Sequence, residues 1–426
     1  NYADPLQLDT LTMGLPSALA SKEAWNYVEV RDGAHMFWWL YYADSVQAQY
    51  KDLPLVMWLQ GGPGGSGTGF GNFEEIGPLN RDLEPRKTSW VQAANLLFVD
   101  NPVGTGFSYT DRPGAYATNV STVASDMLVL LKHFFSEKPE FQSIAFYIFS
   151  ESYGGKMAAA ISLELTKVRR LIFGCFCCSW HSIQFNVSSL LLKSPSSLLD
   201  DYGLADVSKA AEAVKQAVEQ GQFLKATELW SVTESAVERN TNGVNFYNIL
   251  TQSSDEKLTS SAGLDFISLQ KHRHIRPLHS QSLSQLMNGP IRKKLGIIPE
   301  NVTWGGQADE VFTNMAGDFM KPVVDIVDQL LTAGVKVTVY NGQLDLIVDT
   351  MGQELWVKQL KWEGIRNFNE LKWTPLDDPA TPGVTGAFCK TYKNFAFYWI
   401  LKAGHMIPSD QGPMALQMLK MITQQA

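Results

Sequence analysis

Three residues in this chain have the types and the order that nucleophilic catalysis by a serine requires. Ser152 stands in the stretch Glu151-Ser152-Tyr153-Gly154, between an apolar run of strand length and an alanine-rich run of helical length. Asp345 and His405 come later, and each follows a further apolar run. A serine on a strand-to-helix turn, followed by an aspartate and a histidine at strand ends, suits a nucleophile, an orienting carboxylate and a general base. Any one of them could be an ordinary turn or loop residue, but the three in this order favour catalysis.

A glycine-rich stretch, Gln60-Gly61-Gly62-Pro63-Gly64-Gly65-Ser66-Gly67, directly follows the apolar run at 53–59. Glycines let backbone N–H groups approach a ligand closely, so the stretch could hold an anion, receive a developing oxyanion, or simply turn. It lacks the lysine and the helix-opening Ser/Thr of a phosphate loop, and no dinucleotide-binding pattern follows it. Given the serine downstream, we favour the oxyanion role.

Apolar runs alternating with helical patterns predict the elements that must position these residues. Strands are expected at 53–59, 94–100, 144–148, 336–340 and 395–400, and helices at about 123–134, 157–165 and 319–330. Earlier in the chain, Asp32-Gly33 separates two strand-like runs and predicts a hairpin. Strands alternating with helices indicate an α/β fold with a mostly parallel sheet covered on both faces. In such a sheet the site lies beyond the carboxyl ends of the strands, where the serine, aspartate and histidine all fall.

The middle of the chain has a different composition. From about residue 204 to 240 it is rich in Ala, Glu and Lys, and helical patterns continue to about residue 295. We therefore expect an α/β-hydrolase fold in two parts, residues 1–199 and 301–426, with a helical cap inserted at residues 200–300.

Composition and charge exclude several classes of function. The chain has 426 residues, 45% of them apolar and 18% charged, with a formal net charge of −8. This acidic balance, without a sustained lysine/arginine stripe, argues against nucleic acid as the main partner. No apolar run approaches the roughly 20 residues needed to span a bilayer, so no membrane partner is expected.

Three Asn-x-Ser/Thr sequons, at Asn119, Asn186 and Asn301, suit a glycoprotein of the secretory pathway, although such triplets also arise by chance. Because the chain begins at Asn1, a signal peptide is expected to have been removed or to lie outside this numbering. We expect a secreted or lysosomal protein.

Two groups of residues could suggest a metal site: His272, His274 and His279 in the expected cap, and Cys175, Cys177 and Cys178 in the segment before it. Neither group has the spacing of zinc ligands. Cys389 stands alone, so no disulfide framework can be read from spacing. We expect no metal and no cofactor.

Several stretches together resemble the serine carboxypeptidases. They are Trp58-Leu59-Gln60-Gly61-Gly62-Pro63-Gly64, Asp100-Asn101-Pro102-Val103-Gly104-Thr105-Gly106-Phe107-Ser108, Glu151-Ser152-Tyr153-Gly154-Gly155, Tyr340-Asn341-Gly342-Gln343-Leu344-Asp345 and Gly404-His405-Met406-Ile407-Pro408. The resemblance covers nearly the whole chain, and its motifs are specific. It implies an enzyme that hydrolyses the C-terminal peptide bond of peptides or proteins at acidic pH through an acyl-enzyme.

The resemblance also implies roles for individual residues. His405 would take the proton of Ser152, Asp345 would hold the imidazole, and the backbone N–H groups of Gly62 and Tyr153 would receive the oxyanion. The carboxylate of the substrate would be bound by Trp58, Gln60, Gly61, Glu75 and Glu151. Because two carboxyl groups facing a substrate carboxylate cannot all be ionised cheaply, at least one glutamate should keep its proton. A pair of surface glutamates near a cleft is the alternative.

The chain departs from the family pattern in three places. Gln60 stands where the family usually has asparagine, and Gly65 where it often has cysteine. Residues 168–199 replace a strand of the central sheet and the loop after it, as an alternative exon or a gene-model error would. Within this segment, the apolar run Leu171 to Phe176 could supply a substitute strand. Without one, the sheet would lose a strand beside the nucleophile, and fold and activity would suffer.

Two other functions stay open besides peptide hydrolysis. The same triad could serve an acyltransferase or an esterase, or the chain could be a catalytically impaired protein that binds or stabilises a partner. Intact Ser152, Asp345 and His405 argue against the second alternative. The expected partner is a peptide with a free C-terminus, and a homodimer stays open.

Overall fold

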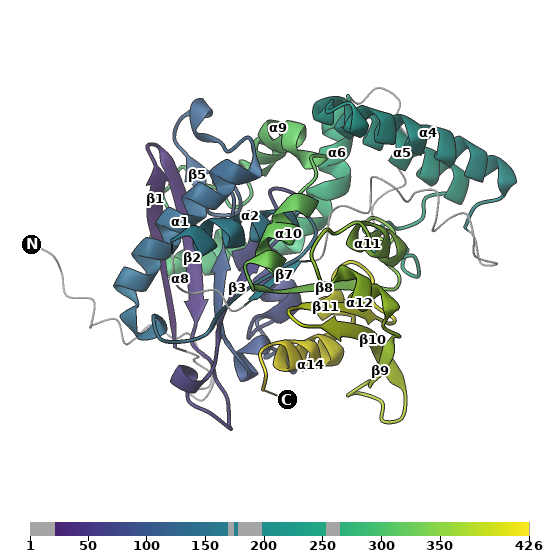
Figure 1. The fold of residues 1–426 in the computed structure, drawn as a ribbon. Helices are drawn as coiled ribbons and strands as arrows, with labels where there is room; N and C mark the ends of the chain where they lie inside the picture. The colour runs from purple at the N-terminus through teal and green to yellow at the C-terminus, as the bar shows by residue number, and fades with distance from the viewer. Residues whose placement is uncertain (1–21, 169–173, 178–197, 253–264, 426) are drawn as a thin grey trace, which may run out of the picture.

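The computed structural model describes residues 22–168, 174–177, 198–252 and 265–425. Its described strands form one sheet in the order β1-β2-β4-β3-β6-β7-β8-β11-β10-β9, with β5 beside β2 (Figure 1). The strands are β1 (Glu23–Arg31), β2 (Ala34–Tyr41), β3 (Leu55–Leu59), β4 (Asn95–Val99), β5 (Tyr109–Thr110), β6 (Phe146–Ser150), β7 (Gly174–Cys177), β8 (Lys336–Gly342), β9 (Thr374–Asp377), β10 (Thr385–Tyr392) and β11 (Phe395–Ile400).

The centre of the sheet is parallel and its two edges are antiparallel. Strands β4, β3, β6, β7, β8 and β11 pair in parallel, whereas β1 and β2 close one edge and β10 and β9 the other. Every residue of β3 and β6 is buried, as expected for parallel strands covered on both faces. Because parallel strands end at the same edge of a sheet, the loops after β3, β6, β8 and β11 come together there.

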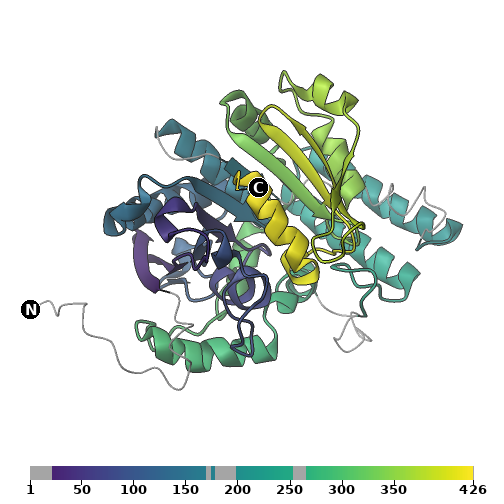
Figure 2. The same cartoon turned by 90° about the horizontal axis from the view of Figure 1, so that it is seen from below.

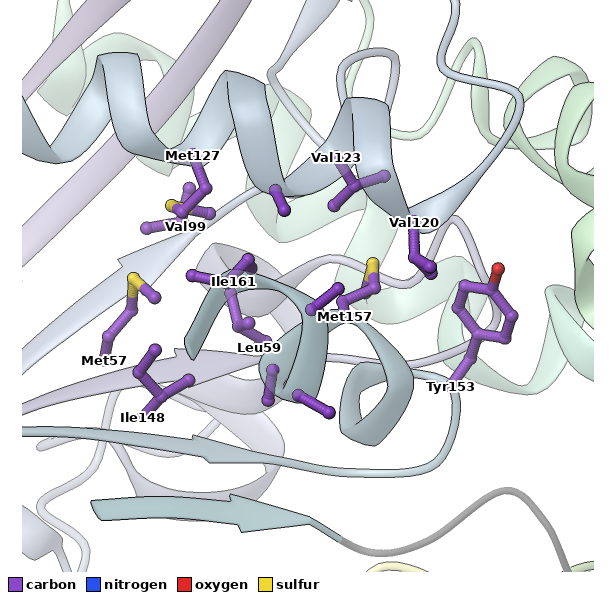
Figure 3. Packing of buried hydrophobic residues seen from close by; sticks show 14 of the residues in the cluster. Met57, Leu59, Val99, Val120, Val123, Met127, Ile148, Tyr153, Met157 and Ile161 are labelled. Carbon is purple, nitrogen blue, oxygen red and sulfur yellow. The ribbon is translucent and has the colours of Figure 1, made fainter. Parts of the chain in front are cut away.

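Helices pack on both faces of the sheet. Helices α1 (Val120–Glu137), α2 (Gly154–Lys167) and α10 (Val324–Thr332) cover one face, and α14 (Gly412–Ile422) lies on the other (Figures 1 and 2). Figure 3 shows Met57 and Ile148 of the strands facing Met127 of α1 and Ile161 of α2. The side chains of a strand alternate between the two faces, so the same strands contribute to the apolar layer on each side of the sheet.

The remaining helices lie mostly after β7. They include α4 (Asp201–Glu219), α5 (Phe223–Thr241), α6 (Phe266–His274), α7 (Gln281–Leu286), α8 (Arg292–Leu295), α9 (Ala308–Phe319), α11 (Thr350–Val357), α12 (Ile365–Glu370), α13 (Ile407–Asp410), the π-helical η2 (Gly67–Ile76) and the short η7 (Arg276–Leu278). Helices α4 and α5 lie side by side and project from the sheet (Figure 1). A helical cap in this part of the chain agrees with the expected change of composition, while the proposed boundaries of the cap at 200–300 stay a prediction.

Most of the expected elements occur. The five expected strands correspond to β3, β4, β6, β8 and β11, and β1 and β2 form the hairpin predicted at Asp32-Gly33. Gly33 has a φ of 68°, the left-handed conformation that makes a glycine useful in this turn.

One expected helix was wrong. A single helix was predicted at about 319–330, but α9 ends at Phe319 and α10 begins at Val324. Pro322 explains the break, because it has no N–H to donate and it disfavours a helical conformation at Lys321.

The atypical segment does supply a strand. β7 pairs in parallel with β6 on one side and with β8 on the other, so it completes the centre of the sheet. The backbone of the strands beside the nucleophile is therefore hydrogen-bonded, as the substitute-strand expectation required. Residues 169–173 and 178–197 lie outside the described part of the chain.

Candidate active site

Ser152 lies on the sharp turn between β6 and α2. Its φ of 56° is in the left-handed region, which is uncommon for a residue other than glycine. The turn is held by Glu151 N, which donates to Leu59 O at 3.1 Å, and by Gly155 N, which donates to Ser152 O at 2.8 Å. The glycine loop presses against it, since a Cβ on Gly61 would lie 2.5 Å from Ser152 Cβ. The turn and the loop thus fit each other only with glycine at position 61.

Asp345 and His405 meet at the carboxyl ends of β8 and β11. His405 Nδ1 lies 2.7 Å from Asp345 Oδ2, and both side chains are buried. The other carboxylate oxygen, Oδ1, accepts a hydrogen bond of 2.9 Å from Val348 N. Burial raises the pKa of Asp345, and the adjacent His405 opposes that rise. A carboxylate at Nδ1 fixes the ring and its tautomer, which leaves Nε2 to exchange a proton with a nucleophile.

A short segment after α5, residues 246–249, holds the loops of both residues. Tyr247 O accepts a 2.7 Å hydrogen bond from His405 N, and the two rings meet edge to face with centroids 5.1 Å apart. Phe246 O accepts from Leu346 N and from Ile347 N, at 3.0 and 3.1 Å. Nothing in the sequence marks this segment, because a backbone contact between a cap segment and two distant loops leaves no motif.

Asp100, at the end of β4, holds the far end of the glycine loop. Its Oδ1 accepts from Ser66 Oγ at 2.6 Å and from Thr68 N at 3.1 Å. Its Oδ2 accepts from Thr68 Oγ1 at 2.7 Å and from Phe107 N at 2.8 Å. Gly62, within the loop, has a φ of 109°, which favours glycine. The predicted oxyanion donor at Gly62 therefore lies in a loop whose end is fixed to Asp100 by three hydrogen bonds, while the fourth joins Asp100 to Phe107.

The side chain of Gln60 is hydrogen-bonded to both predicted glutamates, Glu75 and Glu151. Its Nε2 donates to Glu75 Oε1 at 3.0 Å and to Glu151 Oε1 at 2.8 Å, while its Oε1 accepts from Trp58 Nε1 at 2.7 Å. The alternative of a surface glutamate pair is wrong, since Glu75 and Glu151 are only 1% and 2% exposed. Glu151 directly precedes Ser152, so this polar cluster lies beside the candidate nucleophile.

Burial makes this carboxyl pair hold protons to unusually high pH. It raises the pKa of Glu75 to about 7. It raises the pKa of Glu151 well above its usual value, and the neighbouring Glu75 adds to that rise. The outer oxygens, Glu75 Oε2 and Glu151 Oε2, receive no other donor in the described part of the chain, so a proton between the two groups can satisfy them. Such a pair can donate a hydrogen bond to an anion, as the sequence argument required of one glutamate.

The structure describes two of the three predicted glycosylation residues. Asn119 caps α1, its Oδ1 accepting from Thr122 N at 2.9 Å, and Asn301 is exposed in a turn. Asn186 lies outside the described residues. Glycosylation stays a prediction.

The histidines considered as metal ligands have other partners. His274 Nε2 lies 3.0 Å from Glu234 Oε1, and His279 Nδ1 lies 3.0 Å from Ile275 O. Among the residues that the model describes, no group of three His, Cys, Asp or Glu side chains could hold a metal ion. Cys389 is a free, partly buried thiol; Cys178 is not among the described residues, and only the backbone of Cys175 and Cys177 is.

The fold has a close counterpart among solved structures. The crystal structure of Kex1(delta)p, a prohormone-processing carboxypeptidase from Saccharomyces cerevisiae, superposes with a TM-score of 0.77. It is 20% identical, and the match covers 95% of this chain and 92% of that one. The likeness shows that this chain has the same α/β-hydrolase fold, as the strand pattern predicted.

The sequence is similar to those of serine carboxypeptidases from other organisms over almost its whole length. It is 60% identical to the retinoid-inducible serine carboxypeptidase of Homo sapiens over 420 residues, which cover 95% of this chain and 92% of that protein. It is 41% identical to serine carboxypeptidase-like 51 of Arabidopsis thaliana over 428 residues, covering 94% and 92%. The family model of the serine carboxypeptidases matches residues 14–425. The chain therefore belongs to the serine carboxypeptidase family of hydrolases.

Proposed function

We propose that this chain removes the C-terminal residue of peptides or proteins at acidic pH, with Ser152 as nucleophile, His405 as general base and Asp345 as the residue that orients it. The observation that carries the proposal is the buried pair Glu75 and Glu151, bridged by Gln60 directly beside Ser152. An α/β-hydrolase needs only the triad to cleave an acyl bond, whereas a protonated carboxyl pair next to the nucleophile suits recognition of a free carboxylate.

The reaction proceeds in two halves. Ser152 Oγ attacks the carbonyl carbon of the last peptide bond and gives its proton to His405 Nε2. The backbone N–H groups of Gly62 and Tyr153 receive the oxyanion, each worth about 3 kcal/mol in the transition state. The C–N bond then breaks, and the leaving amine takes the proton from His405. Water attacks the acyl-serine and passes a proton to His405, which gives it to Ser152 Oγ as the ester C–O bond breaks, so the shortened acid and free Ser152 are released.

The carboxylate-binding site explains both the position of the cut and its pH dependence. Gln60 bridges the pair of glutamates and accepts from Trp58 Nε1 at the end of β3, and the Gly61 N–H follows directly in the chain. A protonated pair donates to the substrate carboxylate, and an ionised pair repels it. Because the substrate carboxylate is held at a fixed place, only the bond one residue away reaches Ser152.

An activity that is greatest at acidic pH suits an acidic compartment. We further propose that the protein is secreted or lysosomal and that its substrates are peptides or proteins. Its proposed glycosylation sites are Asn119, Asn186 and Asn301. None of the helices in the described ranges is long and apolar enough to span a bilayer. A homodimer is not part of the proposal.

Product analysis tests the function. N-blocked peptides of the same sequence, with a free or an amidated C-terminus, are incubated with the purified chain at pH 5 and the products are followed by mass. Loss of one residue at a time from the free-acid peptide, and at least tenfold slower loss from the amide, is expected. Internal cleavage, or equal rates on both peptides, would refute recognition of the carboxylate. A His405→Ala variant controls for contaminating peptidases.

A further inference from the structure

A second buried polar cluster touches the turn that carries Ser152. It consists of Tyr153, Lys156 and Asp318, and we call it the Lys156–Asp318 cluster. Lys156 lies in the first turn of α2, and Asp318 lies near the end of α9. Their side chains are 1% and 2% exposed, and Lys156 Nζ lies 3.0 Å from Asp318 Oδ2. The reaction described above uses neither charge.

The charge of Lys156 is unfavourable at the start of its own helix, α2, and favourable at the end of α9. A cation at the start of α2 meets the positive end of that helix dipole, whereas the end of α9 is negative. The ammonium donates to Asp318 O at 2.5 Å, to Asp318 Oδ2 at 3.0 Å and to Phe319 O at 3.3 Å, so all three N–H groups have acceptors. Burial lowers the pKa of Lys156 to about 8, Asp318 opposes this, and Lys321 adds to it. Lys156 thus joins α2 to α9 as long as it keeps its charge.

Asp318 also holds the side chain of Tyr153. The phenol donates to Asp318 Oδ2 at 2.6 Å, and its ring stacks on Phe319 with centroids 6.0 Å apart and planes 7° apart. Val120 N, at the start of α1, donates to Asp318 Oδ1 at 3.4 Å, and Figure 3 shows Tyr153 beside Val120. The ring next to the nucleophile is therefore fixed to α9 and to the start of α1.

Helix α9 reaches the other parts of the site as well. Ala308 O, at its start, lies against the glycine loop, since a Cβ on Gly64 would be 2.9 Å from that oxygen. Thr227 of the cap helix α5 donates to Ala316 O at 2.8 Å. Helix α9 thus contacts the loop that contains Gly62, the side chain of Tyr153, and the cap helix α5.

We infer that Lys156 and Asp318 are positioning residues of the carboxypeptidase reaction, which hold the Tyr153 side chain and thereby keep the Tyr153 backbone N–H aimed at the oxyanion. The inference rests on the proposed function, in which that N–H is a donor. An oxyanion exists only in the transition state, so a displaced donor lowers kcat and leaves KM nearly unchanged. A purely structural pair would change stability without this selective effect on kcat.

The mildest perturbation is Tyr153→Phe, which removes the phenol oxygen and keeps the ring, the backbone N–H and the ion pair. We expect kcat to fall about tenfold, a fraction of the loss for a deleted donor, with KM within about twofold of the wild type. The matched control is Tyr42→Phe, because the Tyr42 phenol also donates to a carboxylate, Glu140, at 2.8 Å. Tyr42 follows the end of β2 that lies beside the start of β4, opposite the carboxyl ends of the parallel strands. This variant should keep wild-type kcat and KM. Thermal unfolding of both variants measures the purely structural part of each change.

A pH profile supplies a second readout. With a C-terminally amidated substrate, which does not need the carboxyl pair, kcat of the wild type should fall as pH rises through about 8, because Lys156 loses its charge there. The charged and titratable groups that face Lys156 are Asp318, Lys321 and the Tyr153 phenol, and burial raises the pKa of the phenol well above its usual value. In Lys156→Met, kcat should be lower than in the wild type, and it should no longer fall as pH rises through about 8. The conservative Asp318→Asn, which keeps an acceptor for the phenol, should retain more activity than Asp318→Ala.

A Ser152→Ala arm separates the two claims. If Ser152→Ala is inactive and Tyr153→Phe keeps the kcat of the wild type, the positioning role is refuted while the proposed function stands. An equal fall of kcat in Tyr153→Phe and in Tyr42→Phe refutes it too. If Ser152→Ala cleaves as fast as the wild type, or neither cleaves any substrate, the proposed function fails and this inference fails with it.

Discussion

Titration of Glu75 should control how well the enzyme distinguishes a free C-terminus from a blocked one. Burial raises the pKa of Glu75 to about 7, and Glu151 keeps its proton to still higher pH. Below pH 7 the pair is neutral and donates to the substrate carboxylate. Above pH 7 it carries a negative charge that repels the same group.

The clearest measurement is a ratio of two rates. We divide kcat/KM for an N-blocked dipeptide by kcat/KM for its C-terminal amide, from pH 5 to pH 9. Both substrates are cleaved by the same triad, so its contribution cancels and the ratio follows the carboxyl pair. With a pKa of about 7, about one Glu75 in eleven is protonated at pH 8, so the ratio should be about tenfold lower there than at pH 5.

A variant of the titrating residue provides the control. Glu75→Gln keeps an acceptor for Gln60 but cannot ionise, so its ratio should be nearly flat around pH 7. A wild-type ratio that stays constant from pH 5 to pH 9, or that rises, would refute the claim that a protonated pair recognises the carboxylate.

Three further predictions follow from the same geometry. Because folding raises the pKa of Glu75 from 4.5 to about 7, the free energy of unfolding should fall by about 3 kcal/mol as pH rises from about 4.5 to about 7; Glu75→Gln cannot ionise and should lack this fall, which urea unfolding of both proteins at pH 4 and pH 8 measures. Asp345→Asn should lower kcat about 10⁴-fold with little change in Tm, since it favours the wrong imidazole tautomer; a loss under tenfold in steady-state kinetics would contradict the assigned role. Gly61→Ala should cost at least about a hundredfold in kcat, because its methyl group would lie 2.5 Å from Ser152 Cβ, whereas Gly114→Ala, with no atom within 4 Å, should behave as the wild type.

The catalytic candidates could be predicted because their signals are local. Ser152, Asp345 and His405 each follow an apolar run, and parallel strands bring such positions to one edge of the sheet. The hairpin at Asp32-Gly33 was likewise predictable from a turn dipeptide. The pairing of Glu75 with Glu151 was implied only by the family resemblance, because the two residues are far apart in sequence and neither has a local signature.

The remaining parts depend on contacts between distant segments. Lys156 and Asp318 are separated by 162 residues, and in the sequence each looks like an ordinary charge on a helix. Residues 246–249 reach the catalytic loops through backbone atoms, which leave no pattern of residue types. The break before α10 was missed for another reason, since the apolar spacing across Pro322 continued as if the helix did.

The most direct test of the account is release of the C-terminal amino acid from an N-blocked dipeptide at pH 5, by the wild-type chain and by Ser152→Ala. The account predicts release by the wild type, and a loss of about 10⁶-fold in kcat for the variant, with the same Tm within a few degrees. Release by Ser152→Ala at the rate of the wild type, or none from a wild-type chain that is folded, would contradict it.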